Sequence, residues 1–102
     1  MATLVVLYNK PANATAFDKH YHDTHIPLAK KIPGLRKYEV SKGTVATPAG
    51  PSDYHLVALL HFDSVADIGA AFGSPEGKAT AADLGNFAQA GAQLLICDTH
   101  PV

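Results

Sequence analysis

The sequence predicts a single α+β domain, in which a four-stranded antiparallel sheet and its helices follow the order β-α-β-β-α-β. Three observations support this fold class. The chain has 102 residues, the usual size of one domain, so we treat residues 1–102 as one unit. Runs of β-branched and aliphatic residues lie near both ends of the chain and at its centre. Helix-capping residues begin the segments between these runs.

The first strand and the first helix occupy the N-terminal third of the chain. Residues 3–8 are mostly β-branched or aliphatic and end at an Asn-Lys-Pro turn, which indicates a buried strand. Asn13 or Thr15 can then cap a helix over residues 15–31. A Pro-Gly pair follows and stops that helix.

The remaining elements alternate in the same way. Residues 35–45 are rich in β-forming residues and predict the second strand, which a loop rich in Pro and Gly connects to a third strand over 53–62. Ser64 then caps a short helix, and a Ser-Pro-Glu sequence begins a longer helix over 75–89. A last apolar strand over 93–100 completes the ferredoxin-like arrangement.

The charge and the composition argue against several classes of protein. Eight basic and nine acidic residues give a formal net charge of −1 without a basic cluster, so we expect no nucleic-acid partner. No apolar run approaches the roughly 18 residues that cross a bilayer, so we expect no membrane association. Cys97 is the only cysteine, and the apolar start of the chain lacks the basic residues of a secretion signal. We therefore expect a cytoplasmic protein.

Both faces of the third strand carry apolar residues. One face carries His55, Val57, Leu59 and His61, and the other carries Tyr54, Leu56, Ala58, Leu60 and Phe62. Helices that lie on one side of an open sheet cover only one face, so the other face would leave apolar side chains in water. We therefore expect a homodimer whose subunits pack through their sheet faces.

The helix expected at 15–31 combines histidines with a proline. At about 100° per residue, its inward stripe consists of Phe17, Tyr21, Thr24, His25, Leu28 and Ile32. His25 should therefore face the interior. Pro27 lacks an amide proton and its ring collides with the carbonyl group of Asp23, so the helix should kink or break beside His25 and free a backbone carbonyl there.

The order of these motifs resembles the EthD-like family, named for ethyl tert-butyl ether degradation, within the dimeric α+β barrel superfamily. The resemblance spans nearly the whole chain and rests on Tyr8, Phe17-x-x-x-Tyr21-x-x-x-His25-x-Pro27, Ile32-Pro33-Gly34-Leu35, Tyr38 and Phe62-Asp63-Ser64. It implies a barrel-forming dimer with a cavity between the helices and the sheet of each subunit. The superfamily includes cofactor-independent monooxygenases, lactone isomerases and polyketide cyclases that act on small, largely apolar molecules.

Three residues are candidates for catalysis. An imidazole titrates near neutral pH, so His25 is the first candidate for proton transfer; the alternative is a buried neutral histidine that bonds a backbone carbonyl. The phenol of Tyr38 could donate a hydrogen bond to a substrate carbonyl or an enolate, or could simply belong to the core. His55 could join His25 if its face of the strand meets the helices. The expected substrate-binding residues are Tyr8, Phe17, Tyr21, Leu28, Leu84 and Phe87.

These residues predict cofactor-free acid/base chemistry on a small, largely apolar molecule, of the isomerase, cyclase or monooxygenase type. The alternative is a non-catalytic carrier or accessory protein for a partner oxygenase, which needs the cavity and not the proton. Asp18, His22 and His25 are spaced so that a helix could bring them to a metal ion, but no second pair of ligands lies nearby in the sequence. We expect neither a metal nor an organic cofactor.

Overall fold

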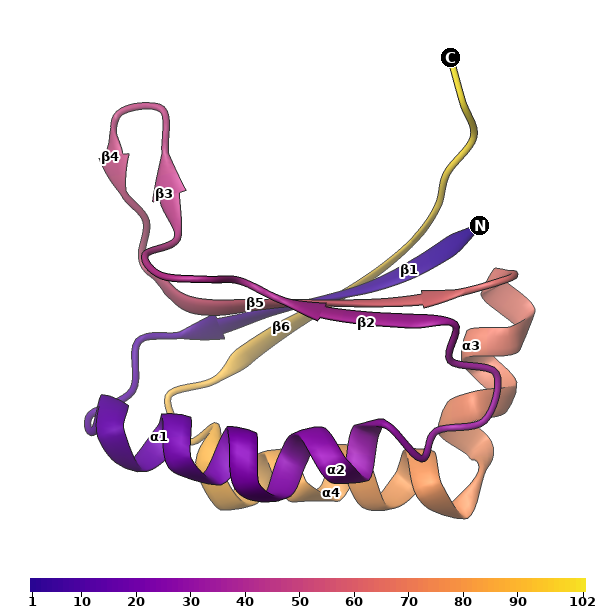
Figure 1. The fold of residues 1–102 in the computed structure, drawn as a ribbon, viewed down its shortest axis with the longest axis horizontal. Coiled ribbons are helices and arrows are strands. Elements are labelled where there is room, and N and C mark those ends of the chain that lie inside the picture. Colours follow the sequence, from indigo (N-terminus) through magenta and orange to yellow (C-terminus); the bar gives the residue numbers. More distant parts are fainter.

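The structure, a computed structural model that describes residues 1–102, contains a four-stranded antiparallel sheet with helices on one face (Figure 1). The strands lie in the order β2, β5, β1, β6, so β1 and β5 are central. Their bounds are Ala2–Asn9 for β1, Lys37–Val40 for β2, Tyr54–Phe62 for β5 and Ala92–Asp98 for β6. The predicted ferredoxin-like α+β fold is confirmed.

Two helical rods lie side by side beneath the sheet (Figure 1). The first rod consists of three consecutive segments, α1 (Ala14–His20), the π-helical η1 (Tyr21–His25) and α2 (Ile26–Ala29). The second rod is α4 (Pro75–Phe87). The helix α3 (Val65–Gly73) connects β5 to α4. The side chain of Asn13 caps α1 by accepting a 3.0 Å hydrogen bond from the amide of Ala16. Ser64 and Ser74 cap α3 and α4 in the same way. None of the helices has the length and the apolar character that crossing a membrane requires.

The first rod contains a π-helical turn immediately before Pro27. The amide of Ile26 donates to the carbonyl of Tyr21, and the backbone on both sides of this turn keeps helical angles. The wider turn accommodates the proline, because it moves away the carbonyl group that the ring would otherwise strike. The predicted break is therefore wrong, since the helix absorbs one extra residue and continues into α2.

The π-helical turn changes which side chains face the sheet. Tyr21 and His25 are buried as predicted, but Thr24 is exposed and Leu28 is only half-buried. Ala29 is buried instead, because the inserted residue rotates the following turn by about 100°. The inward stripe predicted from a regular helix is therefore wrong at Thr24 and Leu28.

The second strand is shorter than predicted. β2 covers Lys37–Val40 and not residues 35–45, and Gly43, with a φ of 74°, turns the chain out of the sheet. A small hairpin, β3 (Ala46–Thr47) and β4 (Gly50–Pro51), replaces the predicted loop. The hairpin projects away from the helical layer, to the open side of the sheet (Figure 1).

The core lies between the helices and one face of the sheet. Even-numbered residues of the two central strands form the sheet side of this core, namely Leu4, Val6, Tyr8, Leu56, Ala58, Leu60 and Phe62. The odd-numbered residues Val5, Leu7, Val57 and Leu59 lie on the opposite face, where nothing in the chain covers them and they remain half-buried. This apolar open face is the surface for which the sequence predicts a second subunit.

A β-bulge at the start of β5 changes the direction of His55. Tyr8 pairs with Leu56, but Asn9 pairs with Tyr54, which leaves His55 without a partner in β1. The extra residue of a bulge no longer follows the strict alternation of the strand. His55 therefore turns toward the helical side.

The bulge separates His55 from His61. Nε2 of His55 lies 2.7 Å from Oδ1 of Asp18 in α1. His61 stays on the open face, where its ring nitrogens lie 3.1 Å from the hydroxyl of Thr3 and 2.8 Å from the carboxylate of Glu39. The expectation that the two histidines share a face is wrong, because the bulge turns His55 to the other face. The sequence does not reveal this bulge.

Candidate active site

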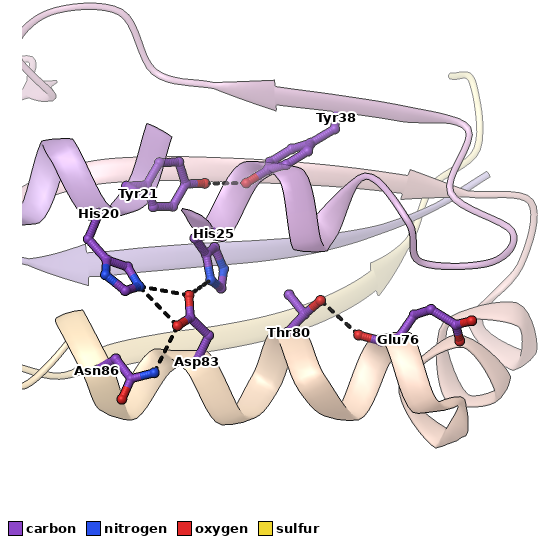
Figure 2. Close-up of polar contacts among 8 residues, drawn as sticks. All are labelled: His20, Tyr21, His25, Tyr38, Glu76, Thr80, Asp83 and Asn86. Atoms are coloured by element: carbon purple, nitrogen blue, oxygen red, sulfur yellow. Dashed lines mark hydrogen bonds and ion pairs between the residues drawn. The ribbon is translucent and has the colours of Figure 1, made fainter. Parts of the chain in front are cut away.

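A buried pair of one histidine and one aspartate joins the two helical rods. His25 of η1 is 4% exposed, and Asp83 of α4 is 5% exposed. Nδ1 of His25 lies 2.9 Å from Oδ2 of Asp83 (Figure 2). The two groups satisfy each other inside an otherwise apolar layer, where an unpaired ionisable group would strongly destabilise the fold.

Three side chains donate to the carboxylate of Asp83 (Figure 2). Besides His25, these are His20, whose Nε2 lies 2.9 and 3.0 Å from the two oxygens, and Asn86, whose amide is 2.9 Å from Oδ1. Burial by itself would raise the pKa of Asp83, but the hydrogen bonds from Asn86, His25 and His20 together hold it below its ordinary value. Asp83 is therefore an anion at neutral pH.

The carboxylate of Asp83 determines the tautomer of His25. Burial lowers the pKa of His25 and outweighs the opposing effect of the hydrogen bond to Asp83, so the ring is neutral near neutral pH. A neutral imidazole beside a carboxylate carries its proton on the facing nitrogen, which here is Nδ1. Nε2 then keeps a lone pair, and no group of the chain bonds to it. The pair thus leaves one basic nitrogen available.

His25 lines an apolar pocket of about 60 Å³ between α4 and the sheet. The wall includes Leu4, Val6, Ala58, Leu60, Phe72 and Leu84. Ala81 of α4 and Leu94 of β6 also line the pocket and are exposed, which places its mouth between these two elements. The volume is well below the ~300 Å³ of a small ligand site, so the pocket can enclose only a reacting group of a few atoms.

Three tyrosines line the pocket beside His25. The hydroxyls of Tyr21 and Tyr38 lie 2.5 Å apart and share a hydrogen bond (Figure 2), and the hydroxyl of Tyr8 has no partner within the chain. Burial raises the pKa of all three phenols. They therefore stay protonated and can act as hydrogen-bond donors, so the pocket combines one base with neutral donors.

Comparison with known proteins identifies the family to which these features belong. The family model described as the EthD domain matches residues 9–91, a range that includes His25, Tyr38 and Asp83. The chain belongs to the EthD family. The resemblance inferred from the sequence motifs is thus confirmed.

Two relatives match this EthD protein over nearly its whole length. An uncharacterized 11.0 kDa protein in the thcB-thcC intergenic region of Rhodococcus erythropolis is 41% identical over 102 residues, which cover 100% of this chain and 98% of that protein. The crystal structure of an EthD family protein from Bacillus halodurans is 37% identical, covers 98% of this chain and 99% of its own, and superposes with a TM-score of 0.90.

Two more distant structures share the fold. A dimeric protein of unknown function and ferredoxin-like fold from Bacteroides fragilis has a TM-score of 0.67 at 17% identity, covering 96% of this chain and 95% of its own. SnoaB, a cofactor-independent oxygenase from Streptomyces nogalater, has a TM-score of 0.67 at 14% identity, covering 99% and 94%. At these identities, the likeness extends to the fold alone.

The pocket of the EthD protein brings together part of the predicted site. His25, Tyr38, Tyr8, Tyr21 and Leu84 all line it. Phe17 and Phe87, also predicted to bind the substrate, do not line the pocket. Their rings pack against each other, and the centre of the Phe87 ring lies 4.7 Å from that of His25. Leu28 does not line the pocket, because the π-helical turn rotates it away.

The structure does not bring His55 to this pocket. His55 lines a separate polar groove, together with Asp18 and His22. His22 is exposed on the outside of the first rod, whereas His25 is buried. Asp18, His22 and His25 therefore do not converge as the metal alternative requires, and no group of three His, Cys, Asp or Glu side chains is arranged to hold a metal ion.

Asp83 is the main functional candidate that the sequence interpretation missed. The inward face of α4 consists of Gly77, Thr80, Asp83 and Phe87, at spacings of a helical stripe. An acidic residue within such a stripe needs a buried partner, and this signal was present in the sequence. The alternative interpretation of His25, a bond to a freed backbone carbonyl, does not describe the structure, because its partner is this carboxylate.

Proposed function

We propose that this EthD protein is a small cofactor-free enzyme that uses His25 as a general base on a small, largely apolar molecule. One observation carries the proposal: Asp83 binds Nδ1 of His25, and the unbonded Nε2 belongs to a ring that lines an apolar pocket. Low solvent access favours the neutral, proton-accepting form of the ring. The pair thus has the geometry of the base and its orienting carboxylate in acid/base catalysis.

The tyrosines supply the complementary part of the proposed chemistry. If Nε2 removes a proton from carbon next to a substrate carbonyl, negative charge develops on the carbonyl oxygen. The hydroxyls of Tyr38 and Tyr8 are neutral donors on the same wall and can stabilise that charge. Return of the proton at another carbon gives an isomerisation, and attack of the enolate within the substrate gives a cyclisation. Addition of dioxygen to the enolate carbon gives a hydroperoxide, and loss of water from it leaves a new carbonyl group, so that one oxygen atom enters the substrate and the other leaves as water, as in a monooxygenase.

The size of the pocket indicates how a substrate would bind. Its volume of about 60 Å³ accommodates the reacting group, while the remainder of the molecule would extend through the mouth. Leu94 is exposed there, and Ile96 follows on the same face of β6. Apolar side chains at the mouth favour an apolar substrate.

The proposed active form is a homodimer through the open sheet face. Leu95 lies opposite Val5 on this face and is 47% exposed, and the hairpin and the chain after β6 both project to the same side (Figure 1). The protein from Bacteroides fragilis that shares the fold is dimeric, which supports a dimer as the active form. A cytoplasmic location belongs to the same proposal, since Cys97 is a free, exposed thiol that a reducing compartment preserves.

The oligomeric state can be tested with two matched substitutions. Leu95→Glu places a charge on the open face, and Val65→Glu places one on α3, where the native side chain is 46% exposed. In sedimentation velocity, Leu95→Glu should give a monomer, because a buried unpaired charge opposes association, and Val65→Glu should stay dimeric. A monomeric native protein, or no difference between the variants, would contradict the proposed interface.

The proposed catalytic base can be tested without knowledge of the natural substrate. Small apolar ketones and lactones in D₂O exchange acidic C–H protons, and the rate of deuterium uptake is read by NMR. The native protein should accelerate exchange for some of these compounds, and His25→Gln should lower the rate by about 10²-fold or more. The control is His22→Gln, the same change on the exposed side of the same rod, which should keep the native rate.

A carrier or accessory protein for a partner oxygenase remains the second candidate. The observation that favours it is the nearly complete apolar lining of the pocket, which binds a ligand without needing a base. The same compounds distinguish the two functions. Binding that is equally tight in the native protein and in His25→Gln, with no exchange in either, would support the carrier and exclude the base.

A further inference from the structure

The polar residues that the pocket leaves unused gather in a second hollow. A groove of about 610 Å³ lies between the first part of α1, the connection from β2 to β3 and the start of β5. Asp18, His22 and His55 all line it. Its volume falls within the range of roughly 300–1,000 Å³ that is typical of small-molecule sites.

Two features of the backbone direct these side chains into the groove. The bulge in β5 turns His55 toward α1, where the carboxylate of Asp18 lies 2.7 Å from Nε2. The ring of Phe17 lies edge-on against the imidazole of His55, with the ring centres 5.0 Å apart. Asp18 and His22 are one helical turn apart on the same side of the first rod. The orientation of His55 is thus fixed by contacts on two sides.

Several hydrogen-bond donors that line the groove have no acceptor within the chain. Lys10 lines it and forms no ion pair within the chain, and the ring of His22 makes no hydrogen bond. The hydroxyl of Ser41 accepts from the amide of Val57 and keeps its own proton to donate. The hydroxyl of Thr44 has no partner. Asp18 pairs with His55 and not with Lys10, so Lys10 is a cation of the groove that has no ion-pair partner.

We propose that this groove is a second ligand site, which binds a small organic acid through its carboxylate. Lys10 and His22 bind the carboxylate, and the hydroxyls of Ser41 and Thr44 donate to the polar remainder of the ligand. His55, held by Asp18, lines the same space and makes no hydrogen bond through Nδ1. This site is distinct from the apolar pocket of His25 and does not depend on the function proposed for that pocket.

The test is a titration of the ¹⁵N-labelled, full-length protein with para-hydroxybenzoate, followed through backbone amide shifts. The methyl ester of this acid is the uncharged control. We expect saturable shifts at groove residues such as Thr44 and His55 with the acid, and at least tenfold weaker binding with the ester. Shifts centred on His25 and Tyr21, or no saturable shifts, would overturn the proposal. If a second subunit covered the groove, the acid would likewise cause no saturable shifts, and the proposed site would be refuted.

A matched pair of lysine substitutions tests the charge. Lys10→Gln should weaken binding of para-hydroxybenzoate by about five- to tenfold, because it removes one charge-assisted contact. Lys30→Gln makes the same change at an exposed position outside the groove and should leave binding unchanged. Both positions are at the surface, so neither substitution should affect folding. Equal weakening in the two variants would show non-specific ion association and refute the site.

Discussion

The Nδ1 atom of His25 lies 2.9 Å from Oδ2 of Asp83, although 58 positions separate the two residues in the chain. This contact joins the first helical rod to α4 and determines which nitrogen of the imidazole remains basic. The π-helical turn before Pro27 places His25 in line with Tyr21 and Ala29 on the buried side. A local feature of the helix and a distant acid therefore define the proposed site together.

Asp83→Asn should abolish the proposed base without removing the side chain. The amide of asparagine can donate to Nδ1 of His25, which then moves the ring proton to Nε2 and blocks the basic position. We expect deuterium exchange to slow by about 10²- to 10⁴-fold, with the fold retained. Asp23→Asn, the same change at an exposed position of the first rod, is the control and should have no effect. A native rate in Asp83→Asn would show that the carboxylate does not orient the base.

Stability should fall in acid from about pH 6.5 downward. The pKa of His25 is lower in the folded state than in the unfolded state, so the unfolded chain binds a proton first as the pH falls. The contribution of His25 is therefore complete above its unfolded pKa and is lost below it. The lowered pKa of Asp83 adds a second loss below about pH 4, its ordinary range.

Urea denaturation at several pH values checks this dependence. The native protein should lose stability between about pH 6.5 and 5, and His25→Gln should lose much of that slope. His22→Gln should retain it, since His22 is exposed. The account fails if stability rises over this range in the native protein.

His20→Gln should raise the pKa of His25. The charge of a protonated His20 opposes protonation of His25, and the two rings compete for one carboxylate. Glutamine can still donate to Asp83 but cannot become a cation. NMR titration of the His25 ring should therefore give a higher midpoint in the variant, and the acid limb of any rate profile should move to higher pH. An unchanged or lower midpoint would show that the rings are not coupled.

Two glycines of α4 should respond oppositely to alanine. A Cβ atom at Gly77 would overlap the backbone carbonyl of Ala71 in α3, whereas nothing lies within 4 Å of a Cβ at Gly85. Gly77→Ala should destabilise the protein by about 2 kcal/mol or more, and Gly85→Ala should stabilise it by about 1 kcal/mol. Thermal unfolding of the two variants measures both values. Equal effects would mean that α3 and α4 do not approach closely at Gly77.

The fold could be predicted from sequence because each element carries its own local signal. The alternation of β1 and β5, the caps at Ser64 and Ser74, and the family motifs all indicate the same arrangement. The inward position of His25 could also be predicted, since it lies one turn after Tyr21 in either helix type. These features depend on neighbouring residues only.

The remaining features of the site depend on contacts that local patterns do not encode. The π-helical turn shifts Leu28, and the bulge redirects His55, because each inserts one residue into a regular period. The partnership of His25 with Asp83 depends on how α4 packs beside the first rod. The sequence signal for this partnership was Asp83, an acidic residue on the inward face of α4.

The most direct test of the account is the tautomer of His25, read from ring ¹⁵N chemical shifts at neutral pH. The structure requires a proton on Nδ1, directed to Asp83, and a bare Nε2. The expected spectrum therefore shows Nε2 of His25 at the shift of an unprotonated nitrogen, and this signal should move in Asp83→Asn. A proton on Nε2 in the native protein, or a ring that averages between tautomers as in free histidine, would contradict the assignment of His25 as the base.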